Sequence, residues 1–368
     1  MNFNEFFLKS FRILLLPFAI VYGFVVMVRN YLYDKNIFKS ADFNLPLICV
    51  GNLAVGGTGK SPMVEYLVEL LQSKFRIATL SRGYKRKTKG YALANEYTTA
   101  VDIGDEPMQF HSKYPNLPVA VGEERIVAIP QLLHDKPGTE AIVLDDAFQH
   151  REVKAGFNIL LTDYNNRFTE DFFLPTGDLR DQRSSYKRAQ VIIVTKCPPD
   201  LSAEEKMAIT NEITPLPHQK IFFTTIVYGE PYHIVSRQQR ALLAQDEVLL
   251  VSGIANPKPL KQLLADSVAS YDQMNYRDHH LFTLEDLKEI ISKFNESVKE
   301  NGLIITTEKD AMRLLKFKQQ LEPLPFYVIP IRHSFLFDEG TAFDNSVTEY
   351  IQNFSSNQSY GQEKTTGA

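Results

Sequence analysis

The sequence predicts an α/β protein with a doubly wound sheet, a second and smaller α/β lobe, and an N-terminal membrane-associated helix. Three observations carry this prediction. Strand-like and helix-like stretches alternate along most of the 368 residues, which is the order of βαβ units. A glycine-rich run directly follows one of the first strands and precedes a helical pattern. An uncharged apolar run lies close to the N-terminus.

The alternation divides into two units. The first unit is residues 37–220. Its predicted strands are 45–50, 76–80, 119–121, 141–144, 158–161 and 191–195, and its predicted helices include 61–73 and 123–134. We expect a two-stranded connection over 221–236 and the smaller C-terminal lobe over 237–352. Residues 353–368 have few apolar side chains and are expected to form a disordered tail.

Composition limits the classes of partner. Net charge is −4 and 44% of the residues are apolar, so the chain has no global basic field to hold nucleic acid. Cys49 and Cys197 are the only cysteines, and neither has a partner at metal-ligand spacing. We therefore expect no nucleic acid partner, no zinc site and no disulfide framework, as in a reducing cytoplasm.

Residues 1–36 form the predicted membrane-associated segment. Within it, Ile13–Met27 is uncharged and apolar and is flanked by Lys9, Arg12 and Arg29. A helix of this length is about 22 Å long, shorter than the roughly 30 Å hydrocarbon core of a bilayer. We favour a helix lying in the membrane interface, with the flanking cations at the headgroups. A true span and a helix packed in a protein core remain alternatives.

The glycine-rich run lies between a predicted strand and an amphipathic helix. Consecutive glycines let backbone N–H groups curl around phosphate oxygens at a helix N-terminus. Lys60 can then reach the β- and γ-phosphates, and the Ser61 hydroxyl can bind Mg²⁺. The P-loop pattern GxxxxGK(S/T) has glycine where this chain has Ala54. We predict a P-loop NTPase-type fold whose nucleotide site is formed by Ala54, Val55, Gly56, Gly57, Thr58, Gly59, Lys60 and Ser61.

Asp145 and Asp146 supply the acidic partner that a P-loop needs for its metal, because they end an apolar strand. A GTPase would have glycine three residues after the strand-end aspartate, where this chain has Phe148. A guanine-binding Asn-Lys-x-Asp motif is replaced by Thr-Lys-Cys-Pro at 195–198. ATP and Mg²⁺ are therefore the predicted ligands.

Polar runs also interrupt the chain where loops should meet the P-loop face, and ligands of open α/β sheets bind at the carboxyl ends of strands. These runs are Ser81–Tyr84, Gly104–Pro107, Gln149–Arg151 and Asp278–His280. Each also has a structural interpretation. Asp105 could cap a helix, Arg82 could be a surface charge, and His279 could be a solvated loop histidine.

The motifs GNLAVGGTGKSP, SRGY, GDEP, DDAFQH, DHH and TTEKDAMRL resemble the tetraacyldisaccharide 4'-kinases of lipid A biosynthesis. The resemblance covers nearly the whole chain, to about residue 330, and departs from the family where Ala147 replaces a glycine. It implies transfer of the γ-phosphate of ATP to the 4'-hydroxyl of tetraacyldisaccharide 1-phosphate, an acylated glucosamine disaccharide lipid, which forms lipid IVA. It also implies a monotopic or peripheral protein on the cytoplasmic face of the bacterial inner membrane.

The resemblance implies roles for individual residues. Asp105 would be the base, His279 of the smaller lobe would pair with it when the lobes close, and Lys60 would act on the phosphates. Metal-binding residues would be Ser61, Asp145 and Asp146. Substrate-binding residues would be Arg82, Tyr84, Glu106, Gln149 and His150. The charged run 308–310 is interpreted as helix capping and solvation. Two alternatives are a membrane-associated P-loop ATPase that uses hydrolysis for conformational work and a non-catalytic nucleotide-binding scaffold.

Overall fold

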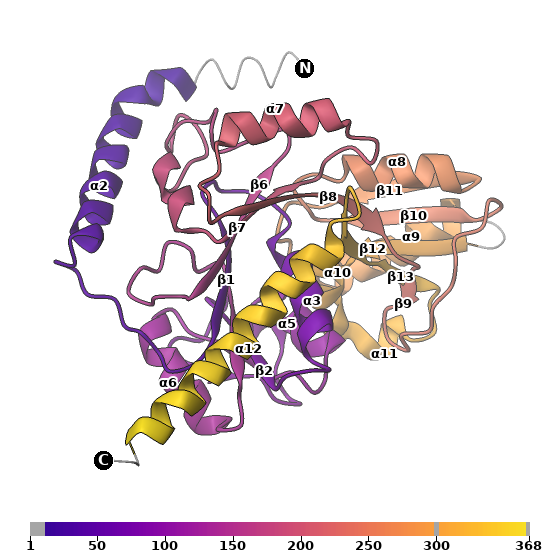
Figure 1. Cartoon of the computed structure of the whole chain (residues 1–368). Coiled ribbons are helices and arrows are strands. Elements are labelled where there is room, and N and C mark those ends of the chain that lie inside the picture. The colour runs from indigo at the N-terminus through magenta and orange to yellow at the C-terminus, as the bar shows by residue number, and fades with distance from the viewer. Residues whose placement is uncertain (1–11, 298–301, 366–368) are drawn as a thin grey trace.

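The computed structural model describes residues 12–297 and 302–365, with the backbone alone for 355–365. The chain folds into two lobes (Figure 1). Over the described residues, the larger lobe contains a nine-stranded sheet and the smaller lobe a five-stranded sheet. The predicted α/β fold, with a doubly wound sheet and a second, smaller lobe, is confirmed.

The strands are β1 (Leu47–Asn52), β2 (Ile77–Ser81), β3 (Ala92–Leu93), β4 (Val119–Val121), β5 (Ala141–Asp145), β6 (Phe157–Asp163), β7 (Val191–Thr195), β8 (Lys220–Tyr228), β9 (Tyr232–His233), β10 (Glu247–Ser252), β11 (Ser270–Asn275), β12 (Gly302–Thr307), β13 (Phe326–Ile329) and β14 (Ile331–Phe335). The helices are η1 (Ile13–Leu15), α2 (Leu16–Asp34), α3 (Lys60–Leu71), α4 (Ala100–Ile103), α5 (Asp105–Lys113), α6 (Arg125–Asp135), η2 (Arg183–Arg188), α7 (Ala203–Ile213), α8 (Lys258–Ser267), α9 (Leu284–Ser297), α10 (Glu308–Leu314), η3 (Leu315–Phe317), α11 (Lys318–Leu321) and α12 (Gly340–Thr365). Every strand predicted in the first unit is present, with differences only at the ends.

Strand β1 lies at the centre of the larger sheet, whose strand order is β14-β8-β7-β6-β1-β5-β2-β4-β3. It pairs in parallel with β5 and β6, and Val50 lies opposite Asp145. All of its residues are buried, because helices cover both faces of the sheet. The glycine-rich loop after β1 therefore begins beside the carboxyl end of β5.

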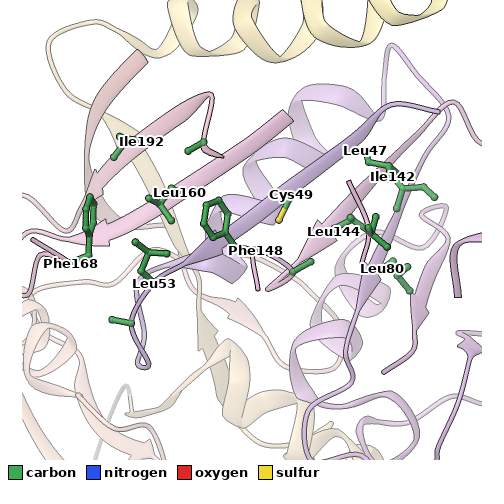
Figure 2. Close-up of a cluster of buried hydrophobic side chains, with 14 of the residues drawn as sticks. Leu47, Cys49, Leu53, Leu80, Ile142, Leu144, Phe148, Leu160, Phe168 and Ile192 are labelled. Atoms are coloured by element: carbon green, nitrogen blue, oxygen red, sulfur yellow. The ribbon is translucent and has the colours of Figure 1, made fainter. Parts of the chain in front are cut away.

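Side chains of β1 alternate between two hydrophobic cores. Leu47 and Cys49 belong to the core shown in Figure 2, which also contains Phe148. Ile48 and Val50 belong to the core on the opposite face, together with residues of α3, α5 and α12. Full burial of a leucine or isoleucine side chain contributes about 1.5–3 kcal/mol relative to exposure. The P-loop is thus attached to a strand that is packed tightly on both faces.

The smaller lobe ends earlier than predicted. Its sheet has the order β11-β10-β12-β13-β9. The next strand, β14, is not part of this sheet and pairs antiparallel with β8 in the larger one. Helix α12 then crosses the larger lobe (Figure 1) and buries Phe343, Val347 and Ile351 in the core that contains α3. The predicted lobe 237–352 is therefore wrong at its C-terminal end, because β14 and the apolar face of α12 find their partners in the larger lobe.

Two other boundary predictions also need correction. The expected two-stranded connection over 221–236 is not a strand pair, because β8 belongs to the larger sheet and β9 to the smaller one. The tail predicted as disordered continues helix α12 as far as Thr365, while 366–368 lie outside the described residues. Turns that follow a helix already held by packing add a hydrogen bond per residue, so a polar segment can continue it.

Helix α2 lies along the outside of the larger lobe (Figure 1) and contacts it through a narrow face. Ala19, Gly23 and Asn30 are its buried residues. The Asn30 side-chain amide donates to Asp181 at 2.7 Å. A Cβ atom on Gly23 would lie 2.6 Å from the ring of Phe173, so only glycine allows this approach. Most of the remaining surface of the helix is exposed and apolar.

Replacing Gly23 with valine tests this packing. We expect Gly23→Val to destabilise the protein by about 1–3 kcal/mol, because the new side chain overlaps the Phe173 ring. Thermal unfolding in detergent gives the measurement, and Val21→Ala on the exposed face of α2 is the control. The double variant Gly23→Val/Phe173→Ala should lose less stability than the two single losses combined. A wild-type melting temperature for Gly23→Val would contradict this packing.

Candidate active site

The P-loop joins β1 to α3 with backbone angles that favour glycine. Gly56 and Gly59 have φ values of 112° and 82°, in the region that side chains with a Cβ rarely adopt. Thr58 is buried and anchors the loop: its hydroxyl oxygen accepts from the Asn52 amide at 2.9 Å, and its carbonyl accepts from the Thr195 hydroxyl at 3.0 Å. The loop is therefore held by the end of β1, from which it starts, and by β7.

His333, on β14, supports the P-loop from the side. Its Nε2 lies 2.9 Å from the carbonyl oxygen of Gly59, and its Nδ1 lies 2.9 Å from the hydroxyl of Thr224. A carbonyl only accepts, so Nε2 carries the ring proton and Nδ1 accepts from Thr224. Burial lowers the pKa of His333 to about 4, which keeps the ring neutral.

Asp145 and Asp146 occupy different electrostatic environments at the end of β5. Burial and the nearby carboxylates of Glu106 and Asp146 raise the pKa of Asp145 to about 7. Its Oδ2 accepts from the Ser81 hydroxyl at 3.3 Å, whereas its buried Oδ1 has no hydrogen-bond partner among the described residues. Asp145 therefore presents an unsatisfied oxygen.

Asp146 points toward two cations. Its Oδ1 lies 3.7 Å from Lys60 Nζ, and its Oδ2 accepts from Arg180 Nη1 at 3.0 Å. Burial acts to raise its pKa, but Lys60 and Arg180 prevail and hold that pKa at about 2. Asp146 is consequently ionised and keeps the lysine of the P-loop in place.

Asp105 begins helix α5 and lies where the two lobes meet. Its Oδ2 is 3.2 Å from Nδ1 of His279, a residue of the smaller lobe with a positive φ of 62°. Arg313, on α10, donates from Nε to the same Oδ2 at 2.7 Å. The ring of Tyr84 lies edge-on to His279 at 5.9 Å between centroids. The structure therefore brings Asp105, His279 and Tyr84 together.

Charged pairs join the lobes beside this point. Glu106 accepts from Lys309 Nζ at 2.6 Å. Lys113 donates to Glu65 of α3 at 2.6 Å and to Glu308 of α10 at 3.0 Å. Asp105 and Glu106 are consecutive, so the first turn of α5 contacts the smaller lobe at two side chains. Residues 308 and 309, interpreted from sequence as capping and solvation, instead make ion pairs across the two lobes.

The other predicted substrate-binding residues have different surroundings. Gln149 donates to the backbone carbonyl of Asn52 at 2.8 Å and so braces the end of β1. His150 contacts Glu152 in its own loop at 3.2 Å. Arg82 is exposed on the loop that follows β2. These three side chains do not contact Asp105, but they lie on loops at the same edge of the sheet.

Sequence reasoning missed several residues of this site. Arg180 binds both Asp146 and the side chain of Asn52. Arg125 is fully buried and donates to the backbone carbonyl of Asp145 at 3.5 Å. Arg180, Arg125 and His333 are remote in sequence from the motifs they support. Only Arg125 could have been found from local sequence, because it is a basic residue near the start of the predicted helix 123–134.

Comparisons with known proteins identify the family. A family model described as tetraacyldisaccharide-1-P 4'-kinase (LpxK) matches residues 11–352. The chain belongs to this family. The tetraacyldisaccharide 4'-kinase of Flavobacterium johnsoniae is 45% identical to it over 342 residues, or 93% of this chain and 97% of that protein. The corresponding protein of Bacteroides thetaiotaomicron is 40% identical over 376 residues, 98% of each chain.

A solved structure agrees with this family. The crystal structure of LpxK from Aquifex aeolicus in complex with ATP matches with a TM-score of 0.72 and 26% identity, covering 93% of this chain and 99% of that one. Membership of the tetraacyldisaccharide-1-P 4'-kinase family confirms the predicted enzyme, an ATP- and Mg²⁺-dependent kinase that phosphorylates the 4' position of the lipid A disaccharide precursor. The alternative of an ATPase that performs conformational work is not favoured.

The pKa of His333 predicts a pH-dependent stability. Its value in the folded chain, about 4, lies below the ordinary 6.5. Between these values the unfolded chain binds a proton that the folded chain does not, so stability falls as pH falls through this window. The loss from pH 7 to pH 5 is about 2 kcal/mol.

Thermal unfolding of His333→Gln measures this contribution. The amide can still donate to Gly59 but does not titrate, so the variant should lose less stability than wild type between pH 7 and pH 5. His218→Gln, at an exposed histidine, should retain the wild-type slope. Equal slopes for His333→Gln and wild type would show that His333 takes up its proton as readily in the folded chain as in the unfolded one.

Proposed function

We propose that Asp105 is the general base that accepts the proton of the sugar 4'-hydroxyl during phosphoryl transfer. A sugar hydroxyl is a poor nucleophile at neutral pH, and a positioned base contributes roughly 10²–10⁴-fold to the rate. The observation that carries the proposal is the meeting of Asp105, from the P-loop lobe, with His279 and Arg313 of the smaller lobe. Lobe contact completes the base and keeps water from the phosphates.

Lys60 would bind the β- and γ-phosphates of ATP, since it follows the glycine loop and is oriented by Asp146. The donors present fit Mg²⁺, because Ser61 is buried at the start of α3 and Asp145 has an unsatisfied oxygen. Bound there, Mg²⁺ would neutralise charge that develops on the phosphate oxygens. Asp146 serves by orienting Lys60 and Arg180 rather than as a free metal ligand.

The lipid substrate requires the site to work at a membrane surface. One described helix, Ile13–Asp34, is long and apolar enough to cross a membrane, and only 17% of its apolar window is buried. Its buried face is bound to the larger lobe: the Tyr22 hydroxyl donates to the carbonyl of Arg180 at 3.0 Å. We propose that α2 lies in the interface of the cytoplasmic leaflet, where ATP is present.

Arg180 connects this helix to the phosphate site. Its backbone accepts from Tyr22, while its guanidinium binds Asp146 and Asn52 beside the P-loop. Arg180 is therefore the residue that connects α2 to Asp146, the carboxylate that contacts Lys60. This proximity supports delivery of the sugar headgroup from the membrane to the site without full extraction of the acyl chains.

Substitution of Asp105 tests the base. We expect Asp105→Asn to lower kcat for transfer to tetraacyldisaccharide 1-phosphate at least about a hundredfold. ATP affinity should change less than about twofold, because Asp105 is not part of the P-loop. Labelled ATP with detergent-solubilised lipid, followed by separation of the bisphosphorylated product, measures the rate. Asp102→Asn, which alters only the cap of α4, is the matched control. Near-normal turnover in Asp105→Asn would remove this residue from the base role.

Three exposed apolar residues on one face of α2 test the membrane proposal. Phe18, Val21 and Val25 are 66%, 64% and 59% exposed and follow helical spacing. The triple change to serine should lower partitioning onto phosphatidylglycerol-containing vesicles at least about tenfold, because apolar surface no longer enters the interface. Flotation measures binding, and Met207→Ser, at an exposed methionine of α7, is the control. Unchanged flotation of the triple variant would contradict interfacial binding by this face.

A further inference from the structure

Arg313 is a buried side chain at the centre of the contact between the lobes. Its side chain is only 2% exposed, although it carries a positive charge. Nε lies 2.7 Å from Asp105 Oδ2, Nη1 lies 3.0 Å from Asp310 Oδ1, and Nη2 lies 3.2 Å from His279 Nδ1. One planar guanidinium thus contacts the proposed base, its histidine neighbour and a second carboxylate.

The smaller lobe fixes this guanidinium from behind. Asp310 is fully buried, and its Oδ2 accepts from the backbone amide of Gly253 at 2.9 Å and from the Thr307 hydroxyl at 2.8 Å. Its other oxygen is thereby aimed at Arg313. The five donors of arginine form a rigid fork, so fixing one end sets the direction of the others. Arg313 meets Asp105 with a geometry that the smaller lobe imposes.

We infer that Arg313 is a positioning residue for phosphoryl transfer, which orients Asp105 through Oδ2 and contacts His279 at Nδ1. The inference rests on the proposed role of Asp105 as the base and adds a residue outside the GDEP and DHH motifs. It also explains why a charged side chain is buried at this position. Burial of a cation costs free energy, and the carboxylates of Asp105 and Asp310 offset that cost for Arg313.

His279 faces Arg313 and Asp105 with the same nitrogen. Its Nδ1 lies 3.2 Å from Arg313 Nη2 and 3.2 Å from Asp105 Oδ2. A guanidinium donates hydrogen bonds and accepts none, whereas a carboxylate oxygen accepts. Asp105 Oδ2 and His279 Nδ1 are therefore both within reach of one donor group, the guanidinium of Arg313.

This arrangement leaves one oxygen of Asp105 for the substrate. None of the described residues donates a hydrogen bond to Oδ1, whereas Oδ2 is occupied by Arg313. As the sugar oxygen forms its bond to the γ-phosphorus, its O–H bond breaks and the proton passes to Oδ1. The bond from the γ-phosphorus to the β,γ-bridging oxygen breaks, and its electron pair leaves with ADP.

Lysine cannot reproduce this geometry. A single ammonium group cannot reach Asp105, Asp310 and His279 in the directions that the three guanidinium nitrogens define. The neighbouring cation Lys309 is already paired with Glu106 at 2.6 Å. Loss of Arg313 would therefore leave the carboxylates of Asp105 and Asp310 facing each other without their shared cation.

Arg313→Lys and Arg313→Met test the inference. Both should lower kcat, the methionine variant by about a hundredfold, since a misplaced base loses most of its benefit. KM and Kd for ATP should stay within about twofold of wild type. Arg240→Lys is the matched control, because Arg240 forms a two-bond pair with buried Asp246 in the same lobe, away from Asp105. Its kcat should remain near that of wild type.

A second experiment, made in the Asp105→Asn variant, separates a positioning role of Arg313 from a general structural effect. In Asp105→Asn, adding Arg313→Met should cause little further loss of kcat, because the residue that Arg313 orients is already inactive. Near-normal kcat in Arg313→Lys, or a further large loss in the Asp105→Asn background, would overturn the inference. If Arg313→Met does not fold, the same double variant is made with Arg313→Lys. Activity retained in Asp105→Asn alone would instead overturn the proposed base.

Discussion

The parallel pairing of β1 with β5 is the constraint on which the site depends. Because Val50 lies opposite Asp145, the glycine loop and the acidic pair leave the sheet at the same edge. The contact between Lys60 and Asp146 follows directly from this pairing. Burial of β1 on both faces keeps these two strands in register.

The same edge creates the electrostatic contrast between the two aspartates. Asp145 is buried among carboxylates and has a raised pKa, whereas Asp146 turns toward Lys60 and Arg180 and has a lowered one. Opposite shifts in adjacent residues indicate different tasks. The carboxyl group of Asp145 is suited to give up a proton when a cation binds, and the carboxylate of Asp146 holds the side chains of Lys60 and Arg180.

Local patterns predicted the parts of the fold that local chemistry determines. The strand, glycine loop and helix around Lys60 are contiguous, so their order and spacing were sufficient. The acidic end of β5 was predicted for the same reason. The meeting of Asp105 with His279 was implied only by the family resemblance, because 174 residues separate them and no spacing rule relates them.

Tertiary pairing decided what the sequence could not predict. β14 is a short strand of mixed polarity, and its place beside β8 depends on an open edge that only the assembled sheet presents. His333 supports Gly59 because of that placement, and the function of Arg313 depends on contact between lobes. The helical continuation of α12 beyond residue 352 likewise depends on packing of its first turns against α3.

The return of the chain to the larger lobe makes the smaller lobe an insertion within another domain. The chain leaves after β8 and comes back into β14, and the two crossing points touch: the Gly229 amide donates to the Pro330 carbonyl at 2.9 Å. An insert whose ends are adjacent can be accommodated without separating the strands of its host. Because both connections lie at one place, any rotation of the insert would turn about this point. The β8–β14 pair that starts there also carries His333 to Gly59, so such a rotation would act on a support of the P-loop.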